Sequence, residues 1–196
     1  MSLRRVCVFC GSSAGNAGAY RAAAEDLGRE MAARGIGLVF GGGSVGLMGY
    51  VADAVLAGGG HAIGVIPDAL VAREIAHRGL PDLRVVQSMH QRKALMAELS
   101  DAFLALPGGF GTFEELCEAI TWTHLGLHRK RCGVLNVGGF YDSLLALFDG
   151  AVHAGFIPDA SREIVCATAD PHELLDRLAL PLSLSSPAWL RSAGDA

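Results

Sequence analysis

The sequence lacks the features that would place the chain in a membrane or on a nucleic acid. No stretch of its 196 residues approaches the roughly 20 continuous apolar residues that a membrane-spanning helix needs. The apolar run VCVFC behind Arg4 and Arg5 is too short for the core of a signal peptide. The formal net charge of −4 argues against binding of nucleic-acid polymers, which requires a basic surface. A small anionic ligand in a local basic pocket remains compatible with this composition.

Cysteine is scarce and shows no disulfide framework. The chain has five cysteines, an odd number, so we expect a reducing compartment, with the cytoplasm as the default. Cys7 and Cys10 form one C-x-x-C, but they lie in the strand-like run RVCVFC, where residues three apart face opposite sides of a sheet. No second C-x-x-C completes a zinc site. We therefore predict core packing for both thiols, in preference to redox or metal chemistry.

The chain also lacks internal repeats, low-complexity segments and composition shifts, which predicts a single domain over residues 1–180 and a loosely held tail over 181–196. Apolar, strand-like runs alternate with helical patterns. Strands are expected at residues 5–10, 36–40, 61–66, 83–87, 101–106, 131–137 and 163–168. The connection over 68–81 is expected to be less regular. This alternation predicts an α/β, Rossmann-like fold, with a parallel sheet covered by helices on both faces.

Glycine, by contrast, is abundant, and it gathers in loops after the expected strands. Three such loops read GSSAG, GGGSVG and PGGFGT, and each leads into a helix. Because the carboxyl ends of parallel strands meet at one edge of a sheet, the loops should converge there. Helix N-termini with free N–H groups favour anions, so the three loops indicate a phosphate-bearing ligand. The candidate phosphate-loop residues are Gly11, Ser12, Ser13, Gly41, Gly42, Gly43 and Gly108.

The second loop allows an alternative, because Gly41, Gly43 and Gly46 also satisfy the dinucleotide fingerprint G-x-G-x-x-G. That fingerprint usually belongs to the first strand–helix unit, whereas this loop follows the second strand. Binding of NAD, and with it an oxidoreductase, is therefore the weaker interpretation.

The stretch LPGGFGTFEEL, residues 106–116, has two interpretations. Thr112 and Glu115 have the T-x-x-E spacing of a capping box, which would make them a helix start. Alternatively, the glycines hold a phosphate and Glu115, expected in the first helical turn and ionised there, acts as a base or stabilises positive charge on a sugar. The adjacent Glu114 would face another direction, toward solvent or an ion pair.

The stretch SMHQRKAL supports the second interpretation. Ser88 and Gln91 again have capping-box spacing, which places Arg92 and Lys93 near a helix start. Cations are disfavoured there by roughly 0.3–1 kcal/mol, and a bound anion would reverse the sign of that effect. A solvated helix face is the alternative.

Together, PGGFGTFEE and MHQRK resemble the Lonely guy (LOG) family of cytokinin riboside 5′-monophosphate phosphoribohydrolases. The resemblance runs from Val6 to about Leu178 and includes CVFCGSS, FGGGSVGLMG, EIAHRGL and ITWTHLGLHRK. It implies a Rossmann-like homodimer that hydrolyses the N-glycosidic bond of a nucleoside 5′-monophosphate, without metal or redox cofactor. Arg92 and Glu115 would be the catalytic pair. The substrate-contacting positions implied by the resemblance are Glu74, Arg92, Lys93, Gly109, Phe110, Gly111, Thr112, Phe113, Glu114, Glu115 and Thr121.

Other interpretations and departures also follow from the sequence. Phe40 and Arg131 stand where the family commonly has Tyr and Pro. Members of the family are often mislabelled as lysine decarboxylases, but this chain shows no pyridoxal-phosphate signature, so we reject that label. His124 and His128 are four apart, as helical metal ligands can be, but the intervening Gly126 and the lack of paired carboxylates weigh against a metal site. A non-catalytic carrier of nucleotide or molybdenum cofactor is the main rival to the enzyme. The base, AMP or its N6-prenylated form, is not determined by the sequence.

Overall fold

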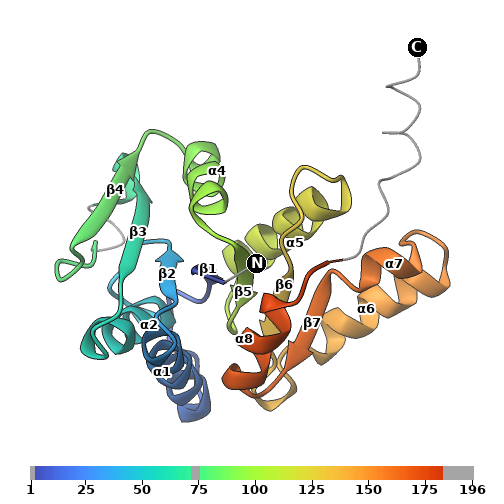
Figure 1. Cartoon of the computed structure of the whole chain (residues 1–196), viewed down its shortest axis with the longest axis horizontal. Helices are drawn as coiled ribbons and strands as arrows, with labels where there is room; N and C mark the ends of the chain where they lie inside the picture. The colour runs from blue at the N-terminus through green and yellow to red at the C-terminus, as the bar shows by residue number, and fades with distance from the viewer. Residues whose placement is uncertain (1–2, 72–75, 183–196) are drawn as a thin grey trace.

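The computed structural model of the chain describes residues 3–71 and 76–182. Its strands form one parallel sheet in the order β4-β3-β2-β1-β5-β6-β7 (Figure 1). The strands are β1 Arg5–Phe9, β2 Gly37–Phe40, β3 Ala62–Pro67, β4 Asp82–Val86, β5 Ala102–Ala105, β6 Cys132–Leu135 and β7 Val165–Thr168. The helices are α1 Gly18–Ala33, α2 Gly46–Ala57, α3 Asp68–Val71, α4 Met89–Leu99, α5 Phe110–His124, α6 Asp142–His153, α7 Asp159–Arg162 and α8 Pro171–Ala179, with a short 3-10 turn, η1, at Val137–Gly139.

The strand order creates a switch point at the centre of the sheet. From β1 the chain proceeds outward through β2, β3 and β4, and then returns to place β5 on the other side of β1. The loops after β1 and β5 therefore leave the sheet in opposite directions, and open parallel sheets bind ligands in the crevice between such loops.

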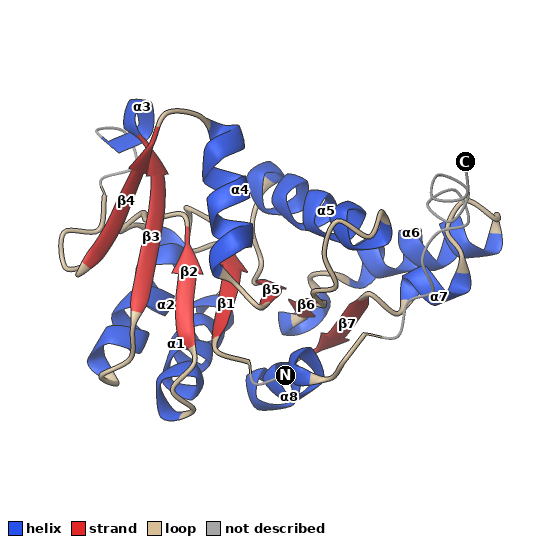
Figure 2. Ribbon diagram, turned by 45° about the horizontal axis from the view of Figure 1, so that its top comes forward, coloured by secondary structure: helices blue, strands red, loops and turns tan. Residues whose placement is uncertain are grey.

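Helices cover both faces of the sheet, as the sequence predicts. Helices α1, α2 and α8 bury one core cluster with the β1 side chains Val6 and Val8, whereas α4 and α5 bury a second cluster with Cys7 and Phe9. The two helix layers lie on opposite sides of the strands in Figure 2. Strands β2, β3, β5 and β6 are buried along their whole length, which explains their nearly continuous apolar sequences.

The C-x-x-C thiols follow the strand alternation. Cys7 belongs to the cluster under α4 and α5, and Cys10, one residue beyond β1, belongs to the cluster under α1 and α2. Both are buried. The prediction of core packing is confirmed.

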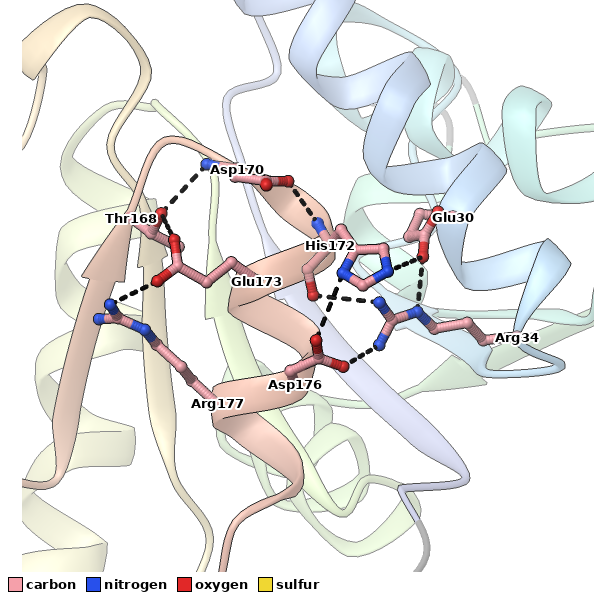
Figure 3. A network of polar contacts seen from close by, with 8 residues as sticks. All are labelled: Glu30, Arg34, Thr168, Asp170, His172, Glu173, Asp176 and Arg177. Atoms are coloured by element: carbon pink, nitrogen blue, oxygen red, sulfur yellow. Dashed lines mark hydrogen bonds and ion pairs between the residues drawn. The ribbon is translucent and has the colours of Figure 1, made fainter.

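Helix α8 is fastened to α1 by a polar network (Figure 3). Arg34 Nη1 lies 2.6 Å from Asp176 Oδ1, and its Nη2 donates to the His172 carbonyl, while its Nε lies 2.6 Å from Glu30 on α1. The start of α8 is set by Asp170, whose side chain accepts from His172 N at 2.9 Å, with Pro171 at the first helical position. The last helix is thus tied to the first one.

Local differences from the predicted elements are small. The segment after β3 contains the four-residue helix α3, and another short helix, α7, ends at Arg162, so that β7 begins two residues later than expected. Strand β6 ends at Leu135 because the chain turns into η1, where Gly138 and Gly139 have φ of 61° and 76°.

The domain boundary at residue 180 remains a prediction, since residues 183–196 lie outside the described part of the chain. At this boundary Arg131 donates to the carbonyls of Glu163, Leu180 and Pro181, and Leu182 is buried. The departure at Arg131 therefore has a structural use, because it holds the chain where it leaves α8.

In the described ranges 3–71 and 76–182, no helix combines the length and the apolar character needed to cross a membrane.

Candidate active site

A cavity of about 300 Å³ opens at the carboxyl end of β1. Its walls come from the loops after β1 and β2, from α2, α3 and α4, and from the start of α5. The lining residues are Val8, Phe9, Cys10, Gly11, Ser12, Gly41, Met48, Leu70, Met89, Arg92, Gly109, Phe110, Gly111, Thr112, Glu114 and Glu115. Two stretches far apart in the sequence, PGGFGTFEE and MHQRK, therefore meet at one site.

The glycine loops converge, and close backbone contacts hold them. Gly11 N donates to the Pro107 carbonyl at 3.1 Å, and Leu47 N donates to the Gly11 carbonyl at 3.0 Å. A Cβ at Gly46, where φ is 63°, would stand 2.3 Å from the carbonyl carbon of Ser12. Of the candidate phosphate-loop residues, Gly11, Ser12 and Gly41 line the cavity, whereas Ser13, Gly42, Gly43 and Gly108 belong to the same loops but not to the lining.

The capping-box interpretation of Thr112 is wrong. Helix α5 begins at Phe110, and its N-cap is Gly109, so Thr112 lies inside the helix with its side chain buried. Its Oγ1 packs so closely over Gly108 that a Cβ there would be 2.1 Å away. The extended backbone at Gly109 starts the helix three residues earlier than the T-x-x-E spacing suggests.

This earlier start also moves Glu115. It lies in the second turn of α5 and not in the first, so the helix dipole acts on it more weakly than expected. The first turn carries no acidic residue and no side-chain cap. Its residues Gly109, Phe110, Gly111 and Thr112 all line the cavity, and the first N–H groups of a helix have no partner within the helix. A helix start of this kind is suited to bind a phosphate.

The cap of α4 is confirmed. Ser88 is the N-cap and its hydroxyl accepts from Gln91 N at 3.2 Å, while the Gln91 side chain accepts from Gln87 N instead of closing the usual box. Arg92 follows in the first turns and is only 6% exposed. Its Nη2 lies 3.4 Å from the Gly41 carbonyl and its Nη1 lies 3.7 Å from Met89 Sδ.

The Arg92 guanidinium keeps unused hydrogen-bonding capacity. Its Nε is buried and has no partner among the described residues. A buried donor without a partner costs roughly 1–3 kcal/mol. Because Arg92 lines the cavity, an anionic or oxygen-rich ligand there would relieve this cost.

Glu115 lines the same cavity, and its charge acts on the thiol of Cys10, another lining residue. Burial raises the pKa of the Cys10 thiol well above its usual value, the nearby Glu115 carboxylate raises it further, and the Arg92 guanidinium lowers it. The same causes act on the pKa of Cys7. A carboxylate and a guanidinium thus flank one small cavity, which can hold an anion at one end and stabilise positive charge at the other.

Lys93 takes a different place from its neighbour. Its Nζ lies 2.5 Å from Glu114 Oε1 and 3.0 Å from Glu118 Oε1, so it links α4 to α5. Partial burial lowers the Lys93 pKa, but the hydrogen bonds to both glutamates outweigh this effect and raise it. Glu114 forms an ion pair, one of its two expected fates, but it also lines the cavity together with Glu115 instead of turning away from it. Lys93 is not among the residues that line the cavity.

The other positions implied by the resemblance are spread out. Phe110 is 92% exposed at the cavity mouth, while Phe113 packs beside the rings of Phe140 and Tyr141. Thr121 lies on the exposed side of α5, with its hydroxyl on the Cys117 carbonyl, and lines a separate groove. Glu74 lies outside the described residues.

Sequence reasoning missed the apolar part of the wall, formed by Met48, Leu70 and Met89. Only Met89 carried a usable signal, because it stands three residues before Arg92 and so shares its side of the helix. Met48 and Leu70 are brought in by α2 and α3, which no local pattern places against α4.

The two histidines considered as metal ligands have other partners. His124 Nδ1 lies 2.9 Å from Ser161 Oγ, and His128 Nδ1 lies 3.1 Å from Thr123 Oγ1. Burial lowers the pKa of His128 to about 4. Residues 3–71 and 76–182 contain no group of three or more His, Cys, Asp or Glu side chains arranged to hold a metal ion.

Comparison with solved structures identifies proteins of the same fold. The chain resembles the molybdenum cofactor binding protein of Rippkaea orientalis, with a TM-score of 0.67 and 21% identity over 90% of this chain and 95% of the other. It resembles the molybdenum cofactor carrier protein of Chlamydomonas reinhardtii equally well, with a TM-score of 0.67 and 22% identity over 89% and 95%. At this identity the likeness concerns the fold alone.

Sequence comparison is more specific. Residues 48–178 match a family model described as "Possible lysine decarboxylase". The chain is 56% identical to the probable cytokinin riboside 5′-monophosphate phosphoribohydrolase LOGL5 of Oryza sativa subsp. japonica, over 89% of this chain and 71% of the relative. It is 54% identical to the cytokinin riboside 5′-monophosphate phosphoribohydrolase LOG3 of Arabidopsis thaliana, over 89% and 81%. With both characteristic motifs on one cavity and this identity along most of its length, the chain belongs to the LOG family of cytokinin riboside 5′-monophosphate phosphoribohydrolases.

Proposed function

We propose that this protein hydrolyses the N-glycosidic bond of cytokinin riboside 5′-monophosphates, AMP or both, giving the free base and ribose 5-phosphate. The observation that carries the proposal is the shared cavity of Arg92 and Glu115, in which the buried Arg92 Nε has no partner among the described residues. The relatives at 54–56% identity, which are named for this reaction, support it.

The phosphate is proposed to bind at the uncapped start of α5. The N–H groups of its first turn and the loops at Gly11 and Gly41 form the polar end of the cavity. Arg92, held on the Gly41 carbonyl, would place its Nε and remaining donors on phosphate or ribose oxygens. Binding the anionic part of the substrate there fixes the ribose relative to Glu115.

Glu115 is proposed to act at the anomeric carbon. As the bond between C1′ and the base nitrogen breaks, its electron pair leaves with the base and positive charge develops on the ribose ring. The Glu115 carboxylate stabilises that charge and orients a water molecule, whose oxygen forms the new bond to C1′. One proton of this water is lost, and the departing base takes up a proton, so the balance is that of a hydrolysis.

Replacement of Glu115 by Gln tests this function. Gln keeps the shape of the side chain and removes its charge, so we expect the release of base and ribose 5-phosphate to fall by about 10²–10³-fold. The assay uses AMP and N6-isopentenyl-AMP in parallel, and the ratio of the two rates identifies the preferred base.

Glu118→Gln is the matched control, because Glu118 is a glutamate on the same helix that pairs with Lys93 and does not line the cavity. Equal activity of the unchanged protein and Glu115→Gln would refute the mechanism. Binding of both nucleotides without release of base would favour the carrier, and a nicotinamide-dependent absorbance change would favour the oxidoreductase.

We further propose that the protein acts as a homodimer in the cytoplasm. Helix α6 carries three Leu and one Phe, yet none of its residues is fully buried, and Phe156, three residues after the helix ends, is exposed. Together with Ile120, Phe148 and Ile157, Phe156 makes an apolar surface near Thr121. A second copy on this surface would bury it, and it would explain why Thr121, a position implied in substrate contact, lies away from its own cavity. The cytoplasmic location rests on the cysteine usage.

A further inference from the structure

His77 lies in the segment between α3 and β4, and it contacts the second glycine loop through its backbone. His77 N donates to the Gly42 carbonyl at 3.0 Å, and the preceding Ala76 forms an antiparallel bridge with Gly43. Its side chain is buried, which is uncommon for histidine.

The side chain of His77 is held at one nitrogen only. Nε2 lies 3.0 Å from Asp53 Oδ1 on α2, whereas Nδ1 is buried and has no partner among the described residues. In the neutral ring only one nitrogen carries hydrogen, and the carboxylate of Asp53 can only accept. The proton therefore belongs on Nε2, where it is donated to Asp53.

The loop Gly41–Gly43 is held in place by backbone contacts from His77 and Ala76. Gly41, Gly42 and Gly43 have no side chains of their own, and Gly42 adopts a φ of 77°. A run of glycines loses more conformational freedom on ordering than other residues do. The loop after β1 is braced by hydrogen bonds to Pro107 and Leu47, and the corresponding braces of the loop after β2 come from His77 and Ala76.

The braced loop also holds Arg92. The Gly41 carbonyl accepts from Arg92 Nη2, and a Cβ at Gly41 would stand only 2.0 Å from that nitrogen. The peptide planes of Gly41 and Gly42 are neighbours, so a rotation at Gly42 changes the direction of the Gly41 carbonyl. A continuous path of contacts thus leads from Asp53 through His77 and the loop to Arg92.

We propose that His77 is a positioning residue, anchored on Asp53, which holds the Gly41–Gly43 loop so that the Gly41 carbonyl orients the Arg92 guanidinium. Its effect on catalysis rests on the function proposed above, whereas its effect on Arg92 does not.

The experiment compares His77→Asn with His77→Gln. The amide nitrogen of Gln reaches the position of Nε2 and can still donate to Asp53. The amide nitrogen of Asn lies near the position of Nδ1, so His77→Asn loses the hydrogen bond to Asp53. The first readout is the NMR signal of the Arg92 Nε–H group, identified by its loss in Arg92→Lys. We expect this signal to shift or broaden in His77→Asn and to return in His77→Gln.

The second readout is base release from AMP or N6-isopentenyl-AMP. Misplacement of Arg92 should lower kcat by about tenfold or more in His77→Asn, with a smaller change in KM, and His77→Gln should restore most of the rate. Asp53→Ala should reproduce His77→Asn without altering the buried ring, because Asp53 is 69% exposed; it keeps the test valid if His77→Asn does not fold. His172→Ala removes another His–Asp contact, on α8, and should change neither readout.

An unchanged Arg92 signal in folded His77→Asn and Asp53→Ala would overturn the proposal. Equal defects in the Asn and Gln variants would also overturn it, since the Asp53 bond would then be irrelevant. If the unchanged protein releases no base from either nucleotide, the proposed function fails, and the Arg92 signal alone decides the positioning role.

Discussion

At the scale of single residues, surroundings decide between roles that the sequence leaves equal. Arg92 and Lys93 are neighbouring cations on α4, but successive helical residues point about 100° apart. Arg92 is buried against the cavity, whereas Lys93 pairs with Glu114 and Glu118 on α5. The unfavourable interaction of two cations with the N-terminal end of the helix dipole is therefore offset differently at the two residues. Lys93 is neutralised by two glutamates, and Arg92 faces the cavity where an anion would bind. Of these two cations, only Arg92 has a buried donor, Nε, that lacks a partner among the described residues.

The close backbone contact at Gly46 gives a prediction at this scale. A Cβ at Gly46 would lie within 2.5 Å of backbone atoms of Ser12 and Ser13, and φ is positive. Backbone cannot move aside as a flexible side chain can, so Gly46→Ala should lower the free energy of unfolding by about 3 kcal/mol or more, as measured by urea denaturation.

Gly59→Ala is the control for backbone strain alone. Gly59 has a φ of 74°, but no atom lies within 4 Å of the added Cβ, so we expect a loss of only about 1 kcal/mol. Equal losses at the two positions would show that the packing of the loops after β1 and β2 contributes nothing beyond the strain.

At the scale of elements, the helix starts show where local patterns succeed and fail. The caps of α4 and α8 are made by side chains, Ser88 and Asp170, so a local motif can show them. The cap of α5 is Gly109, which has no side chain to show. The following T-x-x-E imitates a capping box, but Thr112 is used to pack over Gly108. Of these three helices, α5 is the one without a side-chain cap, and its start lines the cavity.

The network between α1 and α8 predicts a pH dependence. The hydrogen bond from Arg34 lowers the pKa of Asp176 below its ordinary value of 3.8. A carboxyl whose pKa is lower in the folded state stabilises the fold above its unfolded pKa, and this contribution is lost as the pH falls through the folded pKa. Arg34→Met should therefore lower Tm by about 2–4 °C at pH 7, and the difference should shrink below pH 3.8.

Arg29→Met is the matched control, because the ion pair of Arg29 with Asp26 lies within α1. Its Tm should change less at every pH. A difference for Arg34→Met that stays constant between pH 7 and pH 3 would contradict the role of Asp176. Added salt should reduce the effect, because Asp176 is exposed.

At the scale of the whole molecule, the order of the strands makes the site. The chain places β5 beside β1 only after building β2, β3 and β4 on the other side. This order brings α4 and α5 to the same cavity as the loops after β1 and β2. The apolar surface between α6 and α5 is separate from this cavity, and it includes the side of α5 that carries Thr121.

The proposed homodimer predicts that the molar mass in solution falls by half when one interface residue is replaced by a charged one. The unchanged protein should show about twice its chain mass of 20.4 kDa in size-exclusion chromatography with light scattering. Phe156 is 85% exposed at the apolar surface, so Phe156→Asp should place a charge in the interface and give the monomer.

Leu180→Asp is the control, since Leu180 is also an exposed apolar residue but lies by the end of α8. A monomeric mass for the unchanged protein would contradict the proposed dimer. A dimer that survives Phe156→Asp but not Leu180→Asp would place the interface at the other surface.

The sequence by itself determined the α/β class, the approximate position of each strand and the two motifs that meet at the cavity. These follow from local causes, namely continuous apolar runs, glycine-rich turns and side-chain caps. The burial of Cys7 and Cys10 on opposite faces follows in the same way from strand alternation. Only the tertiary structure decided the strand order, the ion pairs of Lys93, the apolar wall of Met48 and Leu70, and the bond between His77 and Asp53. Each of these joins residues far apart in the chain, and such contacts depend on which elements pack together, which no local pattern specifies.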